Sequence, residues 1–165
     1  GAGLPLRFPA GWPVILPFPA ACRAQEPVNE NRPTPVTRCS PSERPGLEFL
    51  AEFLEIAIRH RSDNVEALAE LGHVYTRLGR LAKGLEVDRL LVSLVPDNPT
   101  VHYNLACSLA LTGDAKEALD ALEAAVRLGY SDAAFLVEDG DLTSLRQEPR
   151  FEALLRKLGS TARGK

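Results

Sequence analysis

The sequence predicts an all-α chain organised as a stack of antiparallel helical hairpins. The first observation behind this prediction is an internal repeat, because 65–98 and 99–132 align as two copies of one 34-residue unit. The second is that each copy holds two stretches of helical apolar period, separated by Gly79 in one copy and Gly113 in the other. The residue pairs that are identical at this offset are Leu71 and Leu105, Gly79 and Gly113, Leu85 and Leu119, Val92 and Val126, and Leu94 and Leu128.

Capping signals set the order and the bounds of the helices. Asp63 and Asn64 precede the first helix of the repeat region, and Asn98 precedes the third, because Asx side chains accept hydrogen bonds from the free N–H groups of a first helical turn. Gly129 ends the fourth helix, since glycine adopts the left-handed conformation past a helix end at the least cost. The predicted helices are 65–78, 81–95, 100–112 and 115–128.

A further helix is predicted before the first unit. Pro45 suits a first helical turn, and the residues after it follow a helical apolar period. We expect 46–62 to be an N-terminal capping helix, equivalent to the second helix of a unit whose first helix is replaced by the preceding segment. Phe49, Phe53 and Ile56 widen the apolar face of this helix, which predicts packing on two sides.

Residues 1–45 differ in composition, because they hold ten of the thirteen prolines. Proline lacks a backbone donor and fixes φ, so we expect a Pro-rich irregular or disordered extension. The alternative is a targeting remnant, since the apolar stretch 11–21 loosely resembles a secretory signal interrupted by prolines. The cytoplasm is the favoured location, and a secreted or periplasmic one stays open if 1–45 is such a remnant. The sequence contains no methionine, which indicates that Gly1 is not the native start.

Residues 133–158 no longer follow the repeat and are expected to form C-terminal capping helices. A short helix is predicted at 133–137, a second begins at Asp141, and a third follows Pro149 with an apolar stripe that includes Phe151 and Leu158. Such a cap is needed physically, because two hairpin units alone fall below the roughly three that repeat proteins use to bury a core.

The residue types at the shared positions of the two units resemble the tetratricopeptide repeat (TPR) family. In the first unit the signature falls on Leu68, Leu71–Gly72, Tyr75, Gly84 and Pro96, and in the second on His102, Leu105–Ala106, Leu109, Ala118, Leu122 and Ala125. Asp88 and Tyr130 depart from it, standing where an apolar residue and a proline are usual. The resemblance implies a right-handed TPR solenoid, and the stretch 141–155 is similar to the tail that closes groups of TPR units in bacterial proteins.

In TPR stacks the first helix of each unit lines a concave face, so the resemblance also implies a partner-binding groove. Asn104 is a leading candidate because its amide donates and accepts at once, which suits an extended peptide; the alternative is that it bonds a neighbouring helix. Glu66 and Glu70 stand where chaperone-binding members carry Lys and Asn, and two carboxylates there would repel an acidic tail, which argues against a cochaperone role of that type. The predicted groove residues are Glu66, Glu70, His73, Arg77, Thr100, Tyr103, Asn104 and Cys107.

Composition and motifs favour binding over catalysis. The net charge of −3 gives no sign of a nucleic-acid partner, and three cysteines without a CxxC pair indicate neither a disulfide scaffold nor a zinc site. His73 and Cys107 lack a third group to orient them as a catalytic pair, and the acidic stretch 138–141 is expected to be a solvated turn rather than a calcium loop. We expect no catalysis, cofactor, metal or membrane span.

The predicted function is therefore a non-catalytic scaffold that binds a protein or peptide partner in the groove. The alternative is a structural or assembly module that self-associates as a homo-oligomer or docks on other domains of a larger chain.

Overall fold

The computed structural model describes residues 39–162, and every regular element in that part of the chain is helical. The elements in order are α1 (Arg44–His60), α2 (Val65–Arg77), α3 (Leu81–Leu94), α4 (Pro99–Thr112), α5 (Ala115–Arg127), α6 (Ala133–Glu138), the 3-10 helix η2 (Gly140–Leu145) and α7 (Pro149–Ala162). The all-α prediction is confirmed, and α2 to α5 match their predicted bounds to within one residue. Positions 1–38 of the predicted Pro-rich extension lie outside the described residues.

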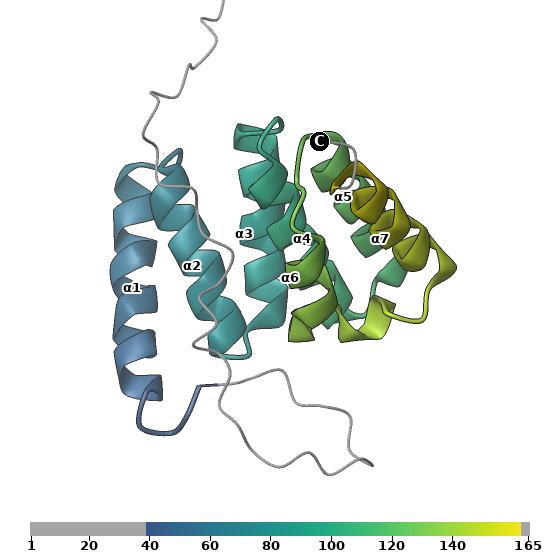
Figure 1. The fold of residues 1–165 in the computed structure, drawn as a ribbon. Helices are drawn as coiled ribbons and strands as arrows, with labels where there is room; N and C mark the ends of the chain where they lie inside the picture. The colour runs from purple at the N-terminus through teal and green to yellow at the C-terminus, as the bar shows by residue number, and fades with distance from the viewer. Residues whose placement is uncertain (1–38, 163–165) are drawn as a thin grey trace, which may run out of the picture.

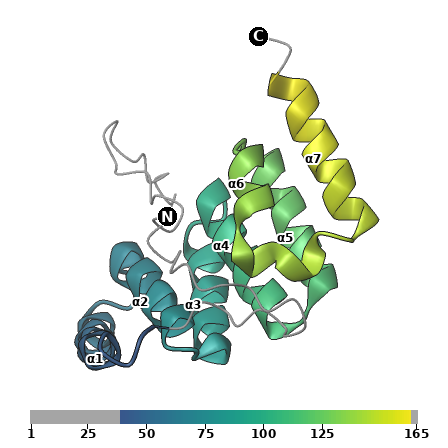
Figure 2. The ribbon, with the colours of Figure 1, turned by 60° about the horizontal axis from the view of Figure 1, so that its bottom comes forward.

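From α1 to α5 the helices pack in chain order. Each helix lies against the one before it, and Figure 1 shows them side by side, with α1 at one end of the stack. After α5 the chain leaves this order, because η2 turns back and packs on α4. Figure 2 shows α6 and η2 over the α4–α5 hairpin, with α7 closing the far end. The repeat therefore ends in a segment that covers its own last hairpin.

Short polar contacts fix the ends of the helices where the sequence predicts them. The Asn64 side chain accepts a hydrogen bond from the Ala67 N–H at 3.0 Å, and the Asn98 side chain accepts from the Thr100 N–H at 2.9 Å. Gly79 and Gly113 have φ values of 74° and 91°, the left-handed region that glycine occupies without steric cost. The turns between helices are thus determined locally.

Replacing Asn98 with alanine is expected to lower the free energy of unfolding by about 1 kcal/mol, because two N–H groups of the first turn of α4 lose their acceptor. Urea unfolding followed by circular dichroism measures the change. Asp97→Ala is the matched control, since Asp97 is an exposed neighbour outside the cap. Equal unfolding midpoints for the two variants would show that the cap does not stabilise α4.

Apolar side chains from successive helices form a core that runs along the stack. One cluster joins α1 to α2 and includes Leu47 and Leu71, and the next joins α2, α3 and α4 through residues such as Leu91. The largest cluster joins α4 and α5 to the C-terminal elements and includes Leu136 and Phe151. The C-terminal elements therefore supply cover that two hairpins alone lack, as the sequence predicts.

Asp88, the departure from the repeat pattern, is buried between helices. Its carboxylate accepts a hydrogen bond from the Ser108 hydroxyl of α4, and it lies against Gly72 of α2, where a Cβ on the glycine would come within 3.2 Å of the carboxylate. Burial raises the pKa of Asp88 to about 7, and the Ser108 hydrogen bond partly opposes this rise. This departure from the repeat signature is thus accommodated by Gly72, which leaves room for the carboxyl group, and by Ser108, which donates a hydrogen bond to it.

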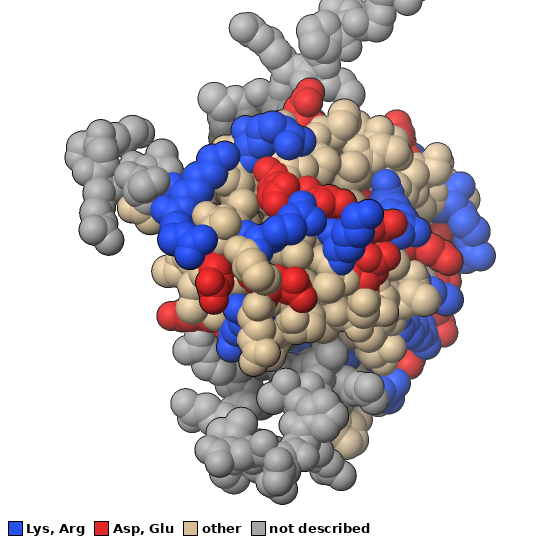
Figure 3. All heavy atoms as spheres, turned by 90° about the vertical axis from the view of Figure 1, so that its right-hand side faces the viewer, with Lys and Arg blue, Asp and Glu red and all other residues tan. Residues whose placement is uncertain are grey.

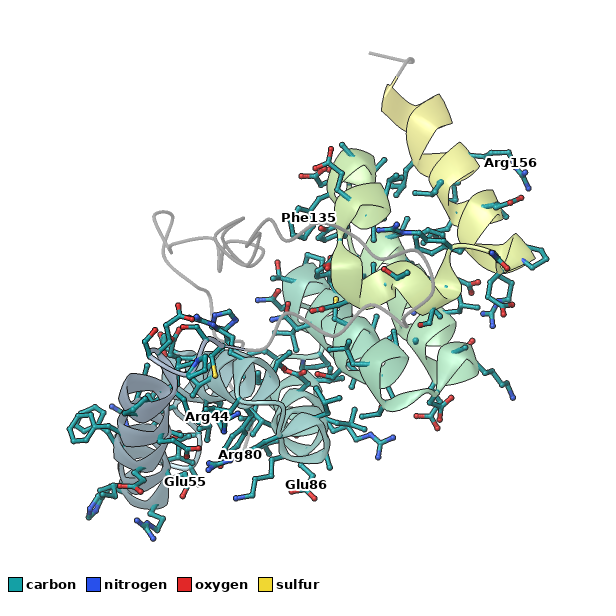
Figure 4. All side chains as sticks on the ribbon, turned by 90° about the horizontal axis from the view of Figure 1, so that it is seen from below. Arg44, Glu55, Arg80, Glu86, Phe135 and Arg156 are labelled. Atoms are coloured by element: carbon teal, nitrogen blue, oxygen red, sulfur yellow. The ribbon has the colours of Figure 1, made fainter. Side chains whose placement is uncertain are left out.

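Ion pairs and hydrogen bonds join the end helices to the stack. At the α1 end, Arg80 pairs with Glu48, and the Tyr75 hydroxyl donates to Glu55. Figure 4 labels Glu55 and Arg80 at this junction, and Phe135 at the distant α6. At the other end Arg150 of α7 pairs with Asp120 and Glu123 of α5. Figure 3 views this end and shows basic side chains interleaved with acidic ones.

The outer face of α1 differs from the expectation that this helix packs on two sides. Its inner face is buried at Leu47 and Leu54, but Phe49, Phe53 and Ile56 are 72%, 58% and 48% exposed. No other element among residues 39–162 lies against them. The physical reason is that α1 ends the stack in this part of the chain, so one side of the helix has no neighbouring hairpin.

Candidate interaction groove

The eight predicted groove residues lie on α2 and α4, and their exposure divides them into three sets. Glu66 and Glu70 are exposed. Tyr103 and Cys107 are buried, with exposed fractions of 0% and 2%. The half-buried members are His73, Arg77, Thr100 and Asn104.

Tyr103 is enclosed by the C-terminal segment. Its hydroxyl donates a hydrogen bond to the Asp139 carboxylate at the start of η2. Its ring stacks on Tyr130, with centroids 4.7 Å apart and an interplanar angle of 2°, and Phe135 of α6 lies tilted at 5.9 Å. Burial is the main cause that raises the pKa of Tyr103, and the neighbouring Cys107 and Asp139 raise it further.

Cys107 belongs to the same contact. Its thiol lies 3.7 Å from the Asp139 carboxylate. Burial, followed by the charges of Asp139 and Asp141, raises the pKa of the Cys107 thiol well above its usual value. A thiol held in its protonated form is a poor nucleophile, so the geometry does not support a catalytic role for Cys107.

Cys107, Asp139 and Asp141 bring three donor atoms within 4.8 Å of one another, a spacing that a metal ion could use. The Asp139 oxygens, however, already accept hydrogen bonds from the Tyr103 hydroxyl and the Asp141 N–H. Burial raises the pKa of Asp141 to about 7, and the Asp139 charge adds to the rise. These three side chains therefore fit a set of polar contacts that holds η2 against α4.

These contacts correct two expectations. The stretch 138–141 was expected to be a solvated turn, yet Asp139 and Asp141 are half-buried and lie close to Cys107 of α4. Tyr103 and Cys107 were expected in an open groove, yet the chain turns back after Gly129 and lays α6 and η2 over them. They are therefore interior residues in this conformation.

His73 and Arg77 occupy the corresponding part of α2. Burial, with a smaller effect of the Arg77 charge, lowers the pKa of His73 to about 4, so its imidazole is neutral at pH 7. The Arg77 guanidinium pairs with Glu43 at 2.9 Å, and the Arg77 carbonyl accepts a hydrogen bond from the Cys39 N–H. Arg77 thus ties the segment before α1 to the end of α2.

The remaining candidates are polar residues of α2 and α4. We call this set the α2–α4 face. It combines two exposed carboxylates with groups able to donate and accept hydrogen bonds to a peptide backbone. Within residues 39–162, no partner is found for the Asn104 amide. The residues of the α2–α4 face are Glu66, Glu70, His73, Thr100 and Asn104.

Comparison with known proteins identifies the fold. No protein-family model matches the sequence. The chain is similar to a solved structure titled "MamA MSR-1 C2", with a TM-score of 0.52 and 20% sequence identity, and the match covers 73% of this chain and 72% of that chain. MamA is a TPR protein, so the TPR-type fold of this chain is confirmed. None of the described helices combines the length and apolar character that crossing a bilayer requires.

Proposed function

We propose that the chain is a non-catalytic scaffold that binds an extended segment of a partner protein along the α2–α4 face. The observation that carries this proposal is that the neighbouring surface of α4 already receives a chain segment. α6 and η2 pack there through the tilted contact of Phe135 with the Tyr103 ring, apolar contacts and the Tyr103–Asp139 hydrogen bond. A TPR hairpin of this chain therefore has the shape and chemistry to hold a short segment.

Because α2 and α4 are equivalent helices of the two repeat units, the surface of α4 that α6 and η2 cover has an equivalent on α2. Ala69 and His73 stand 34 residues before Tyr103 and Cys107, and both side chains are half-buried. Beside them, Glu66 and Glu70 carry two exposed negative charges. These features support a partner segment that presents a basic side chain to the carboxylates and a backbone amide to Asn104.

Peptide display on the full chain tests this proposal. We expect selected peptides to be enriched in Lys and Arg, because Glu66 and Glu70 favour a positive charge. Glu70→Ala and Asn104→Ala are each expected to weaken binding by about 1–3 kcal/mol, or roughly 5- to 150-fold, if their contacts are desolvated in the complex. Isothermal titration calorimetry of one selected peptide measures both variants.

The control is Glu86→Ala, which removes an exposed carboxylate from α3 and leaves the α2–α4 face intact. It is expected to bind the peptide as the wild type does. Equal affinities for all three variants would rule out the α2–α4 face and move the binding surface elsewhere.

A further inference from the structure

We propose that the outer face of α1 is a homodimer interface, in which α1 packs antiparallel on α1 of a second copy. The juxtaposition that carries it is an apolar stripe of Phe49, Phe53 and Ile56, exposed at the end of the stack and flanked on one side by Glu52 and Arg59. This interface is independent of the α2–α4 face.

The stripe is a continuous surface on one side of the helix. At 3.6 residues per turn, Phe49, Phe53, Ile56 and His60 fall on one line, opposite the buried line through Leu47 and Leu54. A surface helix of a monomer usually places polar residues on the side away from the core. Large aromatic side chains there are instead typical of a protein-binding surface.

The charges specify the orientation of the second helix. If Phe53 of one copy lies opposite Ile56 of the second copy, then Phe49 lies opposite His60 of the second copy. The two-fold axis gives each of these two contacts a symmetric equivalent. In an antiparallel helix pair, the residue just before an interface residue of one helix lies beside the residue three positions after the interface residue that it faces on the other helix. Glu52 precedes Phe53, and Arg59 is three after Ile56, so Glu52 of each copy meets Arg59 of the other.

A parallel pair lacks this complementarity, because it places Glu52 opposite Ala57. Within residues 39–162 neither Glu52 nor Arg59 forms an ion pair, so both are available to a partner. A symmetric contact made by one patch on both copies is the commonest way for a protein to form a dimer. The antiparallel pairing thus satisfies both the apolar stripe and its flanking charges.

The size of the contact sets its expected strength. α1 has 17 residues and is therefore about 25 Å long. One helix pair of this length buries less than the roughly 1,600 Å² of a standard interface. We expect a dimer with a dissociation constant on the order of 10 μM, visible at 100 μM and largely dissociated at 1 μM.

Sedimentation velocity of the full chain at these concentrations tests the interface. Phe53→Glu is expected to raise the dissociation constant at least 100-fold, since it buries a charge on the two-fold axis. Its circular dichroism spectrum and melting temperature should match those of the wild type, because Phe53 is mostly exposed. A wild type that stays monomeric at 100 μM would overturn the proposal, including the case in which residues 1–38 cover the stripe.

Charge reversal tests the orientation. Glu52→Arg and Arg59→Glu each create two like-charged contacts, so each variant alone should dimerise about 10- to 100-fold more weakly than the wild type. Mixed together, they should form a heterodimer, because both contacts are then of opposite charge. The matched control is Glu86→Arg, at the equivalent position 34 residues later, which should dimerise as the wild type does. Single variants that dimerise normally, or a mixture that stays monomeric, would overturn the pairing.

Discussion

The stability of the protein is expected to fall by about 4 kcal/mol between pH 4 and pH 8 through Asp88 alone, and an Asp88→Asn variant should lack this loss. Burial raises the pKa of Asp88 from 3.8 to about 7. Between these values the folded chain holds a proton that the unfolded chain has released, so stability falls as pH rises. Each pKa unit corresponds to about 1.4 kcal/mol, which gives the magnitude.

Urea unfolding at several pH values measures this difference. The informative quantity is the free energy of the wild type minus that of the variant, because other groups titrate in both proteins. Below pH 4 the difference should be nearly constant, and it should then shift in favour of the variant up to about pH 7. Glu86→Gln, which neutralises an exposed carboxylate on the same helix, is the control. A constant difference from pH 4 to pH 8 would contradict a buried, protonated Asp88.

Replacing Asp139 with alanine is expected to release α6 and η2 from α4 at a cost of about 2–4 kcal/mol. The change leaves the Tyr103 hydroxyl buried without its acceptor and removes the side-chain cap of η2 at the Asp141 N–H. Cys107, now 2% exposed, should then react faster with iodoacetamide. Mass spectrometry of the Cys107 peptide follows the rate without interference from Cys22 or Cys39.

A second substitution distinguishes this hydrogen bond from a general loss of packing. In a Tyr103→Phe background no hydroxyl is left without an acceptor, so Asp139→Ala should cost clearly less than in the wild type. Urea unfolding of the two single variants and the double variant completes the cycle. Strictly additive costs would show that Tyr103 and Asp139 do not act as a pair.

The hairpins could be predicted from the sequence because their determinants are local. The caps at Asn64 and Asn98 and the glycines after the helices act within a few residues of the helix ends that they specify, and the 34-residue period relates one hairpin to the next. The caps, the glycines and the repeat period all indicate the same helix ends, which is why the predicted bounds of α2 to α5 were accurate to within one residue.

The candidate groove could be predicted only in part, because the burial of Tyr103 and Cys107 depends on contacts with residues that are distant in the sequence. Asp139 meets Tyr103 across 36 positions, after the repeat has ended, and no period links them. The short helix near 133–137 was expected, but nothing local indicates that it would fold back over α4. The accommodation of Asp88 likewise needs Gly72 and Ser108 from two other helices, a combination that appears only when the stack is formed.

We propose that this TPR-type stack binds a partner segment on the α2–α4 face while α6 and η2 occupy the neighbouring surface of α4. The most direct measurement is NMR mapping of backbone amide shifts as a display-selected peptide is titrated into the full chain. We expect the shifts to concentrate in 66–73 and 100–104, with η2 and α7 unchanged. Shifts confined to α3, α5 or the outer face of α1, with none on the α2–α4 face, would contradict the proposal.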